Sequence, residues 1–270
     1  MKRLARHLVQ RHAPGLLADR ARRYEMRLRQ RWGVTAVAER FAQYHGTTVL
    51  AGPSAGLAYR REDLAWVDAP VAKLVGAYEA DLHPILEAVV RRSPRIFVDI
   101  GSADGYYAVG IAIASPATAV HGYDISRSAR RLCAGNARRN GVAHRVHIQA
   151  RCTAAALRRL GSLRGAFVLC DVEGAEDCLF EDEWIELLAG SELLIEVHER
   201  IRPGVLARLT GRFEATHHAV QLRQTARDAG DHPSLAQLSQ TERELALREA
   251  REGLWLHLTP LDRIESGLCI

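Results

Sequence analysis

Residues 96–112 read IFVDIGSADGYYAVGIA, and this stretch limits the folds that the chain can adopt. A short apolar run contains Asp99, Gly101 and Gly105 follow it, and an apolar pattern with helical spacing then begins. That order predicts a strand, a glycine-containing turn and a helix. A dinucleotide-binding turn requires G-x-G-x-x-G, because its second glycine lets the backbone meet a pyrophosphate. Position 103 is alanine, so we expect a different ligand at this turn.

Short apolar runs alternate with helical segments along the rest of the chain. Such alternation predicts βαβ units, in which parallel strands form one sheet with helices on both faces. We therefore expect an α/β, Rossmann-like fold. The expected strands are 95–99, 118–123, 145–150, 166–170 and 192–197, followed by strand-like runs at 213–223 and 254–259. The expected helices between them are 105–114, 127–140, 153–160, 175–189 and 201–212.

The chain divides into three parts by pattern and charge. We expect a basic helical extension at 1–45, a β-hairpin (47–60) and a helix (71–92) within 46–94, and the α/β domain at 95–270. Residues 1–31 carry a net charge of +8 and the remainder −3, so the main body lacks the basic face of a nucleic-acid-binding domain. Helical spacing in 2–31, interrupted at Pro14, favours helices that pack on the body of the protein or on a second subunit, as in a homodimer. Contact with an anionic membrane or with a partner remains an alternative.

The segment from Asp99 to Gly105, DIGSADG, resembles the first motif of class I S-adenosylmethionine-dependent methyltransferases. In that family the glycine loop passes under the amino-acid and sulfonium end of the cofactor. Two glycines permit a tight turn against a ligand, and the carboxylates of Asp99 and Asp104 favour a cation over a phosphate. The resemblance implies cofactor contacts by Asp99, Gly101, Ser102, Ala103, Asp104, Gly105 and Tyr106. It also implies a mostly parallel seven-stranded sheet whose last strand is antiparallel.

A second acidic residue is expected at the end of the next strand, where it accepts both ribose hydroxyls. The run AVHGYD places Asp124 there, 23 residues after Gly101, with Ile125 beside it. An aspartate after a strand is also a common helix N-cap. With the glycine loop present we favour the ribose contact. We expect the loop after the third strand, which contains Cys152, to flank the adenine.

Acidic residues gather at the ends of the fourth and fifth expected strands. DVEGAE begins at Asp171 and includes Glu173, and LLIEVHE includes Glu196 and His198. This pair of segments resembles the FkbM-type methyltransferases, whose pattern is D-x-E-G-x-E followed by a strand ending E-x-H. NARRNGV at 136–142 and the segments at 52–57 and 73–82 extend the resemblance to residues 45–260. The family usually has FEP where this chain has GYD at 122–124.

The resemblance implies transfer of a methyl group to a hydroxyl of a small molecule, a sugar or a lipid-linked acceptor. The acceptor has to be aligned and to lose its proton, which assigns catalytic roles to Asp171, Glu173 and His198. Asp171 is also expected to contact the cofactor. His198 is the favoured base because of its intrinsic pKa. Tyr78, Glu79 and Glu196 are expected to contact the acceptor. We predict no metal ligands, although Asp171, Glu196 and His198 could alternatively bind a divalent cation.

Other functions fit the sequence less well. An amino-directed nucleic-acid methyltransferase would show N-P-P-Y or D-P-P-Y at the fourth strand, which DVEG is not. An oxidoreductase of this kind would need a glycine at position 103, which this chain lacks. A catalytically silent fold that binds a membrane or a partner remains the third alternative. Five scattered cysteines without a C-x-x-C pair argue against a disulfide framework and for a reducing cytoplasm. No apolar run reaches the length of about 18 residues needed to span a membrane.

Overall fold

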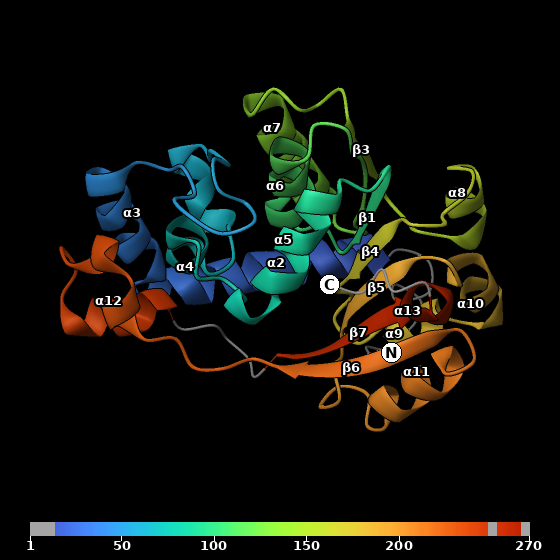
Figure 1. Cartoon of the computed structure of the whole chain (residues 1–270). Coiled ribbons are helices and arrows are strands. Elements are labelled where there is room, and N and C mark those ends of the chain that lie inside the picture. The colour runs from blue at the N-terminus through green and yellow to red at the C-terminus, as the bar shows by residue number, and fades with distance from the viewer. Residues whose placement is uncertain (1–13, 248–252, 266–270) are drawn as a thin grey trace, which may run out of the picture.

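The computed structural model describes residues 14–247 and 253–265, which form one seven-stranded sheet with helices on both faces (Figure 1). The strand order is β3-β2-β1-β4-β5-β7-β6. β7 runs antiparallel to both of its neighbours, and the other pairings are parallel. This topology confirms the predicted Rossmann-like fold, with its mostly parallel seven-stranded sheet and antiparallel last strand. The strands are β1 (Ile96–Ile100), β2 (Ala119–Tyr123), β3 (Val146–Gln149), β4 (Phe167–Cys170), β5 (Glu192–Glu196), β6 (His217–Arg223) and β7 (Leu254–Pro260).

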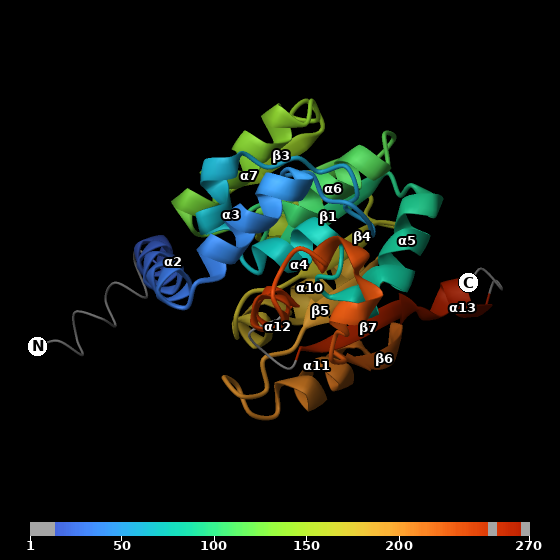
Figure 2. The same ribbon diagram turned by 90° about the vertical axis from the view of Figure 1, so that its left-hand side faces the viewer.

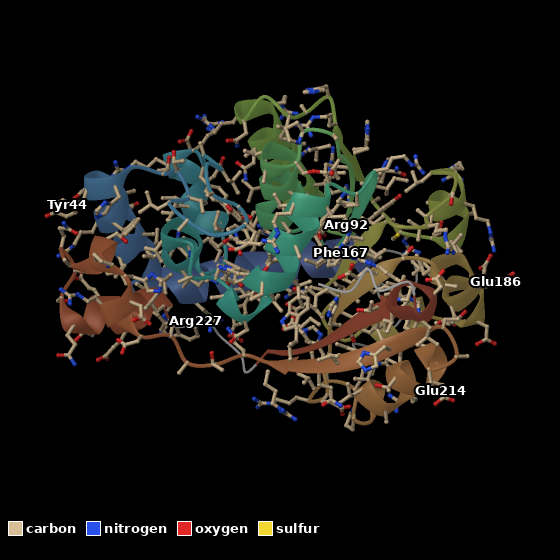
Figure 3. All side chains as sticks on the ribbon, in the orientation of Figure 1. Tyr44, Arg92, Phe167, Glu186, Glu214 and Arg227 are labelled. Atoms are coloured by element: carbon tan, nitrogen blue, oxygen red, sulfur yellow. The ribbon has the colours of Figure 1, made fainter. Side chains whose placement is uncertain are left out.

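Two apolar clusters form the core, one on each face of the sheet, because successive strand side chains point to opposite faces. Phe97 and Phe167 stack at 5.6 Å within one cluster, and Val98 and Val168 belong to the other. Figure 3 shows Phe167 near the centre of the molecule. The first face is covered by α5 (His83–Arg92), α6 (Tyr106–Ala114) and α7 (Arg127–Arg139). The second is covered by α8 (Ala154–Arg158), α10 (Asp182–Leu188) and α11 (Val205–Phe213), with α9 (Glu176–Leu179) and α13 (Leu261–Glu265) nearby.

The segment before the sheet differs from its sequence prediction. The runs at 47–60 form a single antiparallel bridge, between Thr48 and Ala58, in place of a hairpin. The helix expected at 71–92 is divided into α4 (Pro70–Val75), η2 (Ala80–Leu82) and α5. Gly76 interrupts it with φ of 78°, and a Cβ there would lie 2.2 Å from the carbonyl oxygen of Ala51. The break therefore follows from a close backbone contact that helical spacing cannot reveal.

Helices distant in sequence complete this side of the molecule. Figure 1 shows α12 (Gln240–Leu247) beside α3 (Val34–His45) and α4, and these helices are in contact. The remaining short helices are η1 (Arg61–Trp66), η3 (Ala229–Asp231) and η4 (Pro233–Leu235). No helix among the described residues has both the length and the apolar character to cross a bilayer.

The described part of the basic extension is α2 (Pro14–Arg31), which contacts α3, α7 and η1. Figure 2 shows α2 at the edge of the molecule next to α3. It packs on the protein's own body, as we favoured from its sequence. The part of the predicted helical segment before residue 14 lies outside the described residues.

Candidate active site

The carboxyl ends of β1, β2 and β4 open into a cavity of about 580 Å³, which we call the cofactor cavity. Its size is typical of small-molecule sites. Apolar side chains such as Ile100, Val172 and Leu179 form much of its wall. Of the residues predicted to contact a cofactor, Gly101, Ala103, Asp124, Ile125, Cys152 and Asp171 line it.

Asp124 lies at one side of this cavity, at the end of β2. Its Oδ2 accepts a hydrogen bond from the backbone N–H of Ala103 at 3.0 Å, and its Oδ1 accepts one from that of Ser126 at 2.7 Å. Burial raises the pKa of Asp124, and the two backbone hydrogen bonds oppose that effect. A carboxylate has about four lone-pair sites, so two remain for ribose hydroxyls. The N-cap of α7 is Ser126, not Asp124.

The two glycines of the first turn are required by contacts within the protein. Gly101 has φ of 96°, and a Cβ there would lie 1.7 Å from the carbonyl oxygen of Asp171. Gly105 has φ of 86°, and its Cβ would lie 2.7 Å from the Sγ of Cys133. We expected a ligand against the backbone to demand these glycines. The structure gives a different reason, which is that β4 and α7 pack directly against the turn.

The carboxylates of Asp99 and Asp104 are both buried, and neither lines the cofactor cavity. Asp99 accepts a hydrogen bond from the backbone N–H of Ala108 at 3.1 Å, and burial raises its pKa to about 8. Asp104 accepts from Lys73 Nζ at 2.7 Å and from the Tyr59 hydroxyl at 2.6 Å. We expected the carboxylates of Asp99 and Asp104 to attract a cationic ligand. Their burial and their hydrogen bonds within the protein do not fit that expectation. Ser102, Gly105 and Tyr106 also lie outside the cavity lining.

Helix α2 covers the open side of the cofactor cavity with Ala18, Ala21, Arg22 and Glu25. Two contacts attach it to the β2–α7 loop. Asp19 Oδ1 accepts hydrogen bonds from the Oγ atoms of Ser126 and Ser128 at 2.5 and 2.8 Å, and from the Ser128 backbone N–H at 3.0 Å.

The second contact is close packing, since a Cβ on Gly15 would lie 2.4 Å from the carbonyl oxygen of Ile125. The sequence prediction missed this cover entirely. A helix's apolar spacing indicates that it packs, but it does not reveal which loop the helix packs on.

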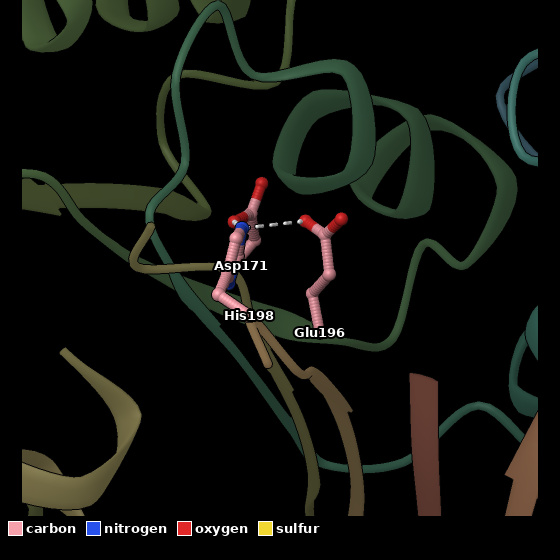
Figure 4. Close-up of side chains that lie close together, drawn as sticks. All are labelled: Asp171, Glu196 and His198. Carbon is pink, nitrogen blue, oxygen red and sulfur yellow. Dashed lines mark ion pairs between the residues drawn. The ribbon is translucent and has the colours of Figure 1, made fainter. Parts of the chain in front are cut away.

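Asp171, Glu196 and His198 meet at the ends of β4 and β5, pointing toward one another (Figure 4). His198 Nε2 lies 3.8 Å from Asp171 Oδ1 and 3.7 Å from Glu196 Oε2. Burial and the neighbouring charge of Asp171 raise the pKa of Glu196 far above its usual range. This shift favours the protonated form of Glu196, which can donate a hydrogen bond to Asp171 and so lets the two carboxyl groups stay adjacent.

Glu176 holds the other side of the His198 ring. Its fully buried Oε1 lies 2.7 Å from His198 Nδ1 and also accepts the backbone N–H of Gly174 at 3.0 Å. Burial alone would lower the pKa of His198, but the hydrogen bond to Glu176 and the charge of Asp171 raise it overall. The carboxylate selects the tautomer with hydrogen on Nδ1, which leaves Nε2 to accept a proton.

Glu173 lies differently from the other predicted catalytic residues. Its side chain is 56% exposed, with Oε2 at 3.5 Å from His198 Nε2, and its backbone has a positive φ of 54°. Glu176, which we did not include in the predicted site, is the acid in direct contact with the histidine. The only sequence signal was its place in DVEGAE, where the first turn of a helix also favours acids.

A second cavity, of about 340 Å³, adjoins the first and is called here the acceptor cavity. Tyr78, Glu79 and Glu196, the residues predicted to contact an acceptor, all line it. Glu79 accepts a hydrogen bond from the hydroxyl of Tyr107, and Tyr78 packs edge-on against Tyr106 at 5.4 Å. The two cavities share Arg22, Glu25, Ala103, Asp171 and Glu173.

The groups at the two strand ends also satisfy a minimum requirement of a metal site. One donor atom from each of Asp171, Glu196 and His198 lies within 4.8 Å of the others. A mixed carboxylate and imidazole set suits Mn²⁺, Fe²⁺ or Zn²⁺ better than Ca²⁺. The proton held by Glu196 provides a different explanation for the close carboxyl groups, and this explanation needs no cation.

Structural comparison finds proteins of similar fold at low sequence identity. An O-methyltransferase from Bacillus cereus, in complex with SAH, is 13% identical with a TM-score of 0.44, over 64% of this chain and 77% of that one. The O-methyltransferase TomG from Streptomyces achromogenes, in complex with SAM, is 17% identical with a TM-score of 0.47, over 68% and 81%. An rRNA methylase from Streptococcus thermophilus is 13% identical with a TM-score of 0.48, over 67% and 96%. No protein-family model and no curated protein sequence matches the chain.

Proposed function

We propose that this protein is an S-adenosylmethionine-dependent methyltransferase that acts on a hydroxyl oxygen, in the manner of the FkbM-type enzymes. The observation that carries the proposal is the arrangement of the two cavities. The cofactor cavity has Asp124 and Asp171 among its lining residues, and it meets the acceptor cavity at Asp171. A ligand held at Asp124 and reaching Asp171 would present its far end to whatever occupies the acceptor cavity.

The residues of the cofactor cavity are suited to the parts of such a cofactor. Asp124 has free acceptor sites for ribose hydroxyls, while Ile125 and Cys152 provide apolar surface for adenine. Gly101 and Ala103 bring backbone close to the amino-acid end. When bound, S-adenosylmethionine supplies a methyl group already activated on a sulfonium. The protein then has to align an acceptor oxygen and take its proton.

His198 is the proposed proton acceptor; it lines neither cavity itself and adjoins them through Asp171 and Glu196. Its Nδ1 is held by Glu176, so its Nε2 faces the side on which Asp171 and Glu196 lie. A proton taken by Nε2 would be stabilised by the neighbouring carboxylate of Asp171. The raised pKa makes His198 a stronger base than free imidazole, at the cost of a larger protonated fraction at neutral pH.

The setting of the reaction is also part of the proposal. We place the enzyme in the cytoplasm, since the four cysteines within the described residues are all free thiols. The acceptor is proposed to enter beside Tyr78 and Glu79, which both line the acceptor cavity.

The test is calorimetric titration of S-adenosylmethionine into the wild type and Asp124→Ala. We expect the substitution to weaken binding by about 1–3 kcal/mol, because the ribose hydroxyls lose their acceptor. Asp228→Ala is the control: its Oδ1 accepts the N–H of Gly230 at 2.8 Å, as that of Asp124 accepts Ser126. Equal binding by the wild type and Asp124→Ala would refute the assignment of Asp124 to the ribose. No binding to the wild type would refute the proposed methyltransferase function.

A further inference from the structure

A third cavity, of about 620 Å³, lies between α2, α7 and η1 and is strongly basic. We call it the arginine groove. Its lining contains five arginines and one carboxylate, that of Asp63. Three of the arginines come from α7, where Arg131 and Arg138 are two turns apart on the same side of the helix. The five arginines are Arg22, Arg60, Arg131, Arg138 and Arg139.

The α7 arginines of the groove are not held in ion pairs, although the charge of Arg139 acts on the carboxylates of Glu62 and Asp63. Within the described part of the chain, none of Arg131, Arg138 and Arg139 takes part in an ion pair, whereas Arg60 pairs with Glu62. All three are exposed. Several guanidinium groups held around one hollow repel each other unless an anion lies between them, and their planar forks suit phosphate oxygens.

The groove is connected to the proposed active site through Arg22 and Trp66. Arg22 lines the cofactor cavity, the acceptor cavity and the groove, and Trp66 lines the last two. The Nη2 of Arg22 donates a hydrogen bond to the carbonyl oxygen of Trp66 at 2.9 Å, which fixes the position of the guanidinium between the cavities. The acceptor cavity and the groove therefore adjoin each other at Arg22 and Trp66.

The two cavities differ in the sign of their net charge. Seven acidic residues line the acceptor cavity together with three cations, Arg22, Arg29 and Lys73, and burial favours the uncharged form of one of the acids, Glu196. The groove is lined mainly by arginines. An anionic group would be disfavoured beside the catalytic carboxyls and favoured in the groove. This separation orients a molecule that has a hydroxyl at one end and a negative charge at the other.

We propose that the arginine groove binds a phosphate or diphosphate ester carried by the methyl acceptor, while the hydroxyl to be methylated lies in the acceptor cavity. The inference rests on the proposed methyltransferase function and names its substrate class. The phosphate takes no part in the reaction and serves as a handle that positions the acceptor. Its source is either a soluble phosphate ester or a phosphate-bearing lipid, which share this chemistry.

The test uses inorganic pyrophosphate as the probe, titrated calorimetrically into the wild type and the double variant Arg131→Gln/Arg138→Gln. Arg158→Gln/Arg159→Gln, at the C-terminal end of α8 on the opposite face of the sheet, removes the same charge and is the control, although Arg158 pairs with Glu183. We expect the groove variant to bind pyrophosphate about tenfold or more weakly, since charge-assisted hydrogen bonds are lost, and the control to bind as the wild type does.

Two further measurements separate the outcomes. S-adenosylmethionine binding that is equal in all three proteins shows that the cofactor site is intact, so a failure of the groove is distinct from a failure of the proposed function. Sedimentation with phosphatidylcholine vesicles, with and without phosphatidylglycerol, identifies the source: groove-dependent binding to the anionic vesicles supports a lipid, and pyrophosphate binding alone supports a soluble ester.

Pyrophosphate binding that is absent from the wild type, or unchanged in the groove variant, would overturn the proposal. Groove-dependent binding of a short single-stranded RNA that is much tighter than binding of pyrophosphate would overturn it as well, because the groove would then be a nucleic-acid surface.

Discussion

The buried ion pair between Lys73 and Asp104 gives the sharpest quantitative prediction. Lys73 Nζ lies 2.7 Å from Asp104 Oδ1, and their side chains are 4% and 1% exposed. The contact joins α4 to the turn after β1, so it links the segment before the sheet to the cofactor loop. We consider Lys73→Met, which removes the charge and keeps a side chain of similar length, so that little cavity is created.

The expected cost follows from what Asp104 would lose. In the variant the carboxylate would retain only the Tyr59 hydroxyl, at 2.6 Å, as a side-chain donor to its oxygens. Removing one partner of a buried ion pair costs about 3–5 kcal/mol, because the other charge stays buried without compensation. A loss of that size lowers the melting temperature of a chain this long by roughly 10 °C.

The pH dependence provides an independent check. Burial would raise the pKa of Asp104, but Lys73 and the hydrogen bonds lower it overall, so in the wild type this group stabilises the fold above its unfolded pKa. That contribution is lost as the pH falls through the lowered pKa. In Lys73→Met burial dominates and the pKa rises, so the slope reverses and acid should reduce the cost of the substitution.

Urea denaturation of four proteins measures these effects. Lys73→Met is compared with the wild type, with Lys73→Met/Asp104→Asn, and with Arg29→Met, which breaks the more exposed pair between Arg29 and Asp68. We expect the double variant to recover about 2 kcal/mol, and the surface control to cost at most about 1 kcal/mol. A Lys73→Met variant that stays within about 1 kcal/mol of the wild type, roughly the most that an exposed ion pair contributes, would refute the reasoning.

Three further predictions concern the site. Glu176→Gln should lower the pKa of His198 by removing its charged partner, as followed by NMR of the ring protons; an unchanged titration would exclude Glu176 as the partner that tunes this histidine. Asp19→Asn should weaken S-adenosylmethionine binding about 5- to 20-fold in calorimetry by loosening α2 over the cavity, whereas unaltered affinity would show that α2 does not retain the ligand. The pKa of Asp99 is raised to about 8 in the folded state and is about 4 in the unfolded state. Between about pH 4 and 8 the folded state therefore keeps a proton that the unfolded state has lost, and the contribution of Asp99 to stability falls as the pH rises through this window. Asp99→Asn should therefore flatten the urea-derived stability profile there, and an identical profile would contradict the assigned pKa.

The sheet and much of the site could be predicted from sequence because strand periodicity is local. Parallel strands bring their carboxyl ends to one edge, so Asp124, Asp171 and Glu196 could be placed together from their positions in the chain alone. Contacts between distant segments could not be predicted in this way. The attachment of α2 through Asp19 and the buried contact of Glu176 with His198 depend on tertiary packing, and nothing in their local spacing indicates them.

The contact between Gly101 and the carbonyl oxygen of Asp171 changes what the glycine turn can tell about related chains. A larger residue at 101 would separate β1 from the end of β4 whether or not a cofactor ever binds. Selection for folding alone would therefore keep this glycine in a descendant that had lost its chemistry. The glycine turn therefore reports on the fold, and a search for relatives that share the proposed chemistry should rank them by the residues around His198 instead.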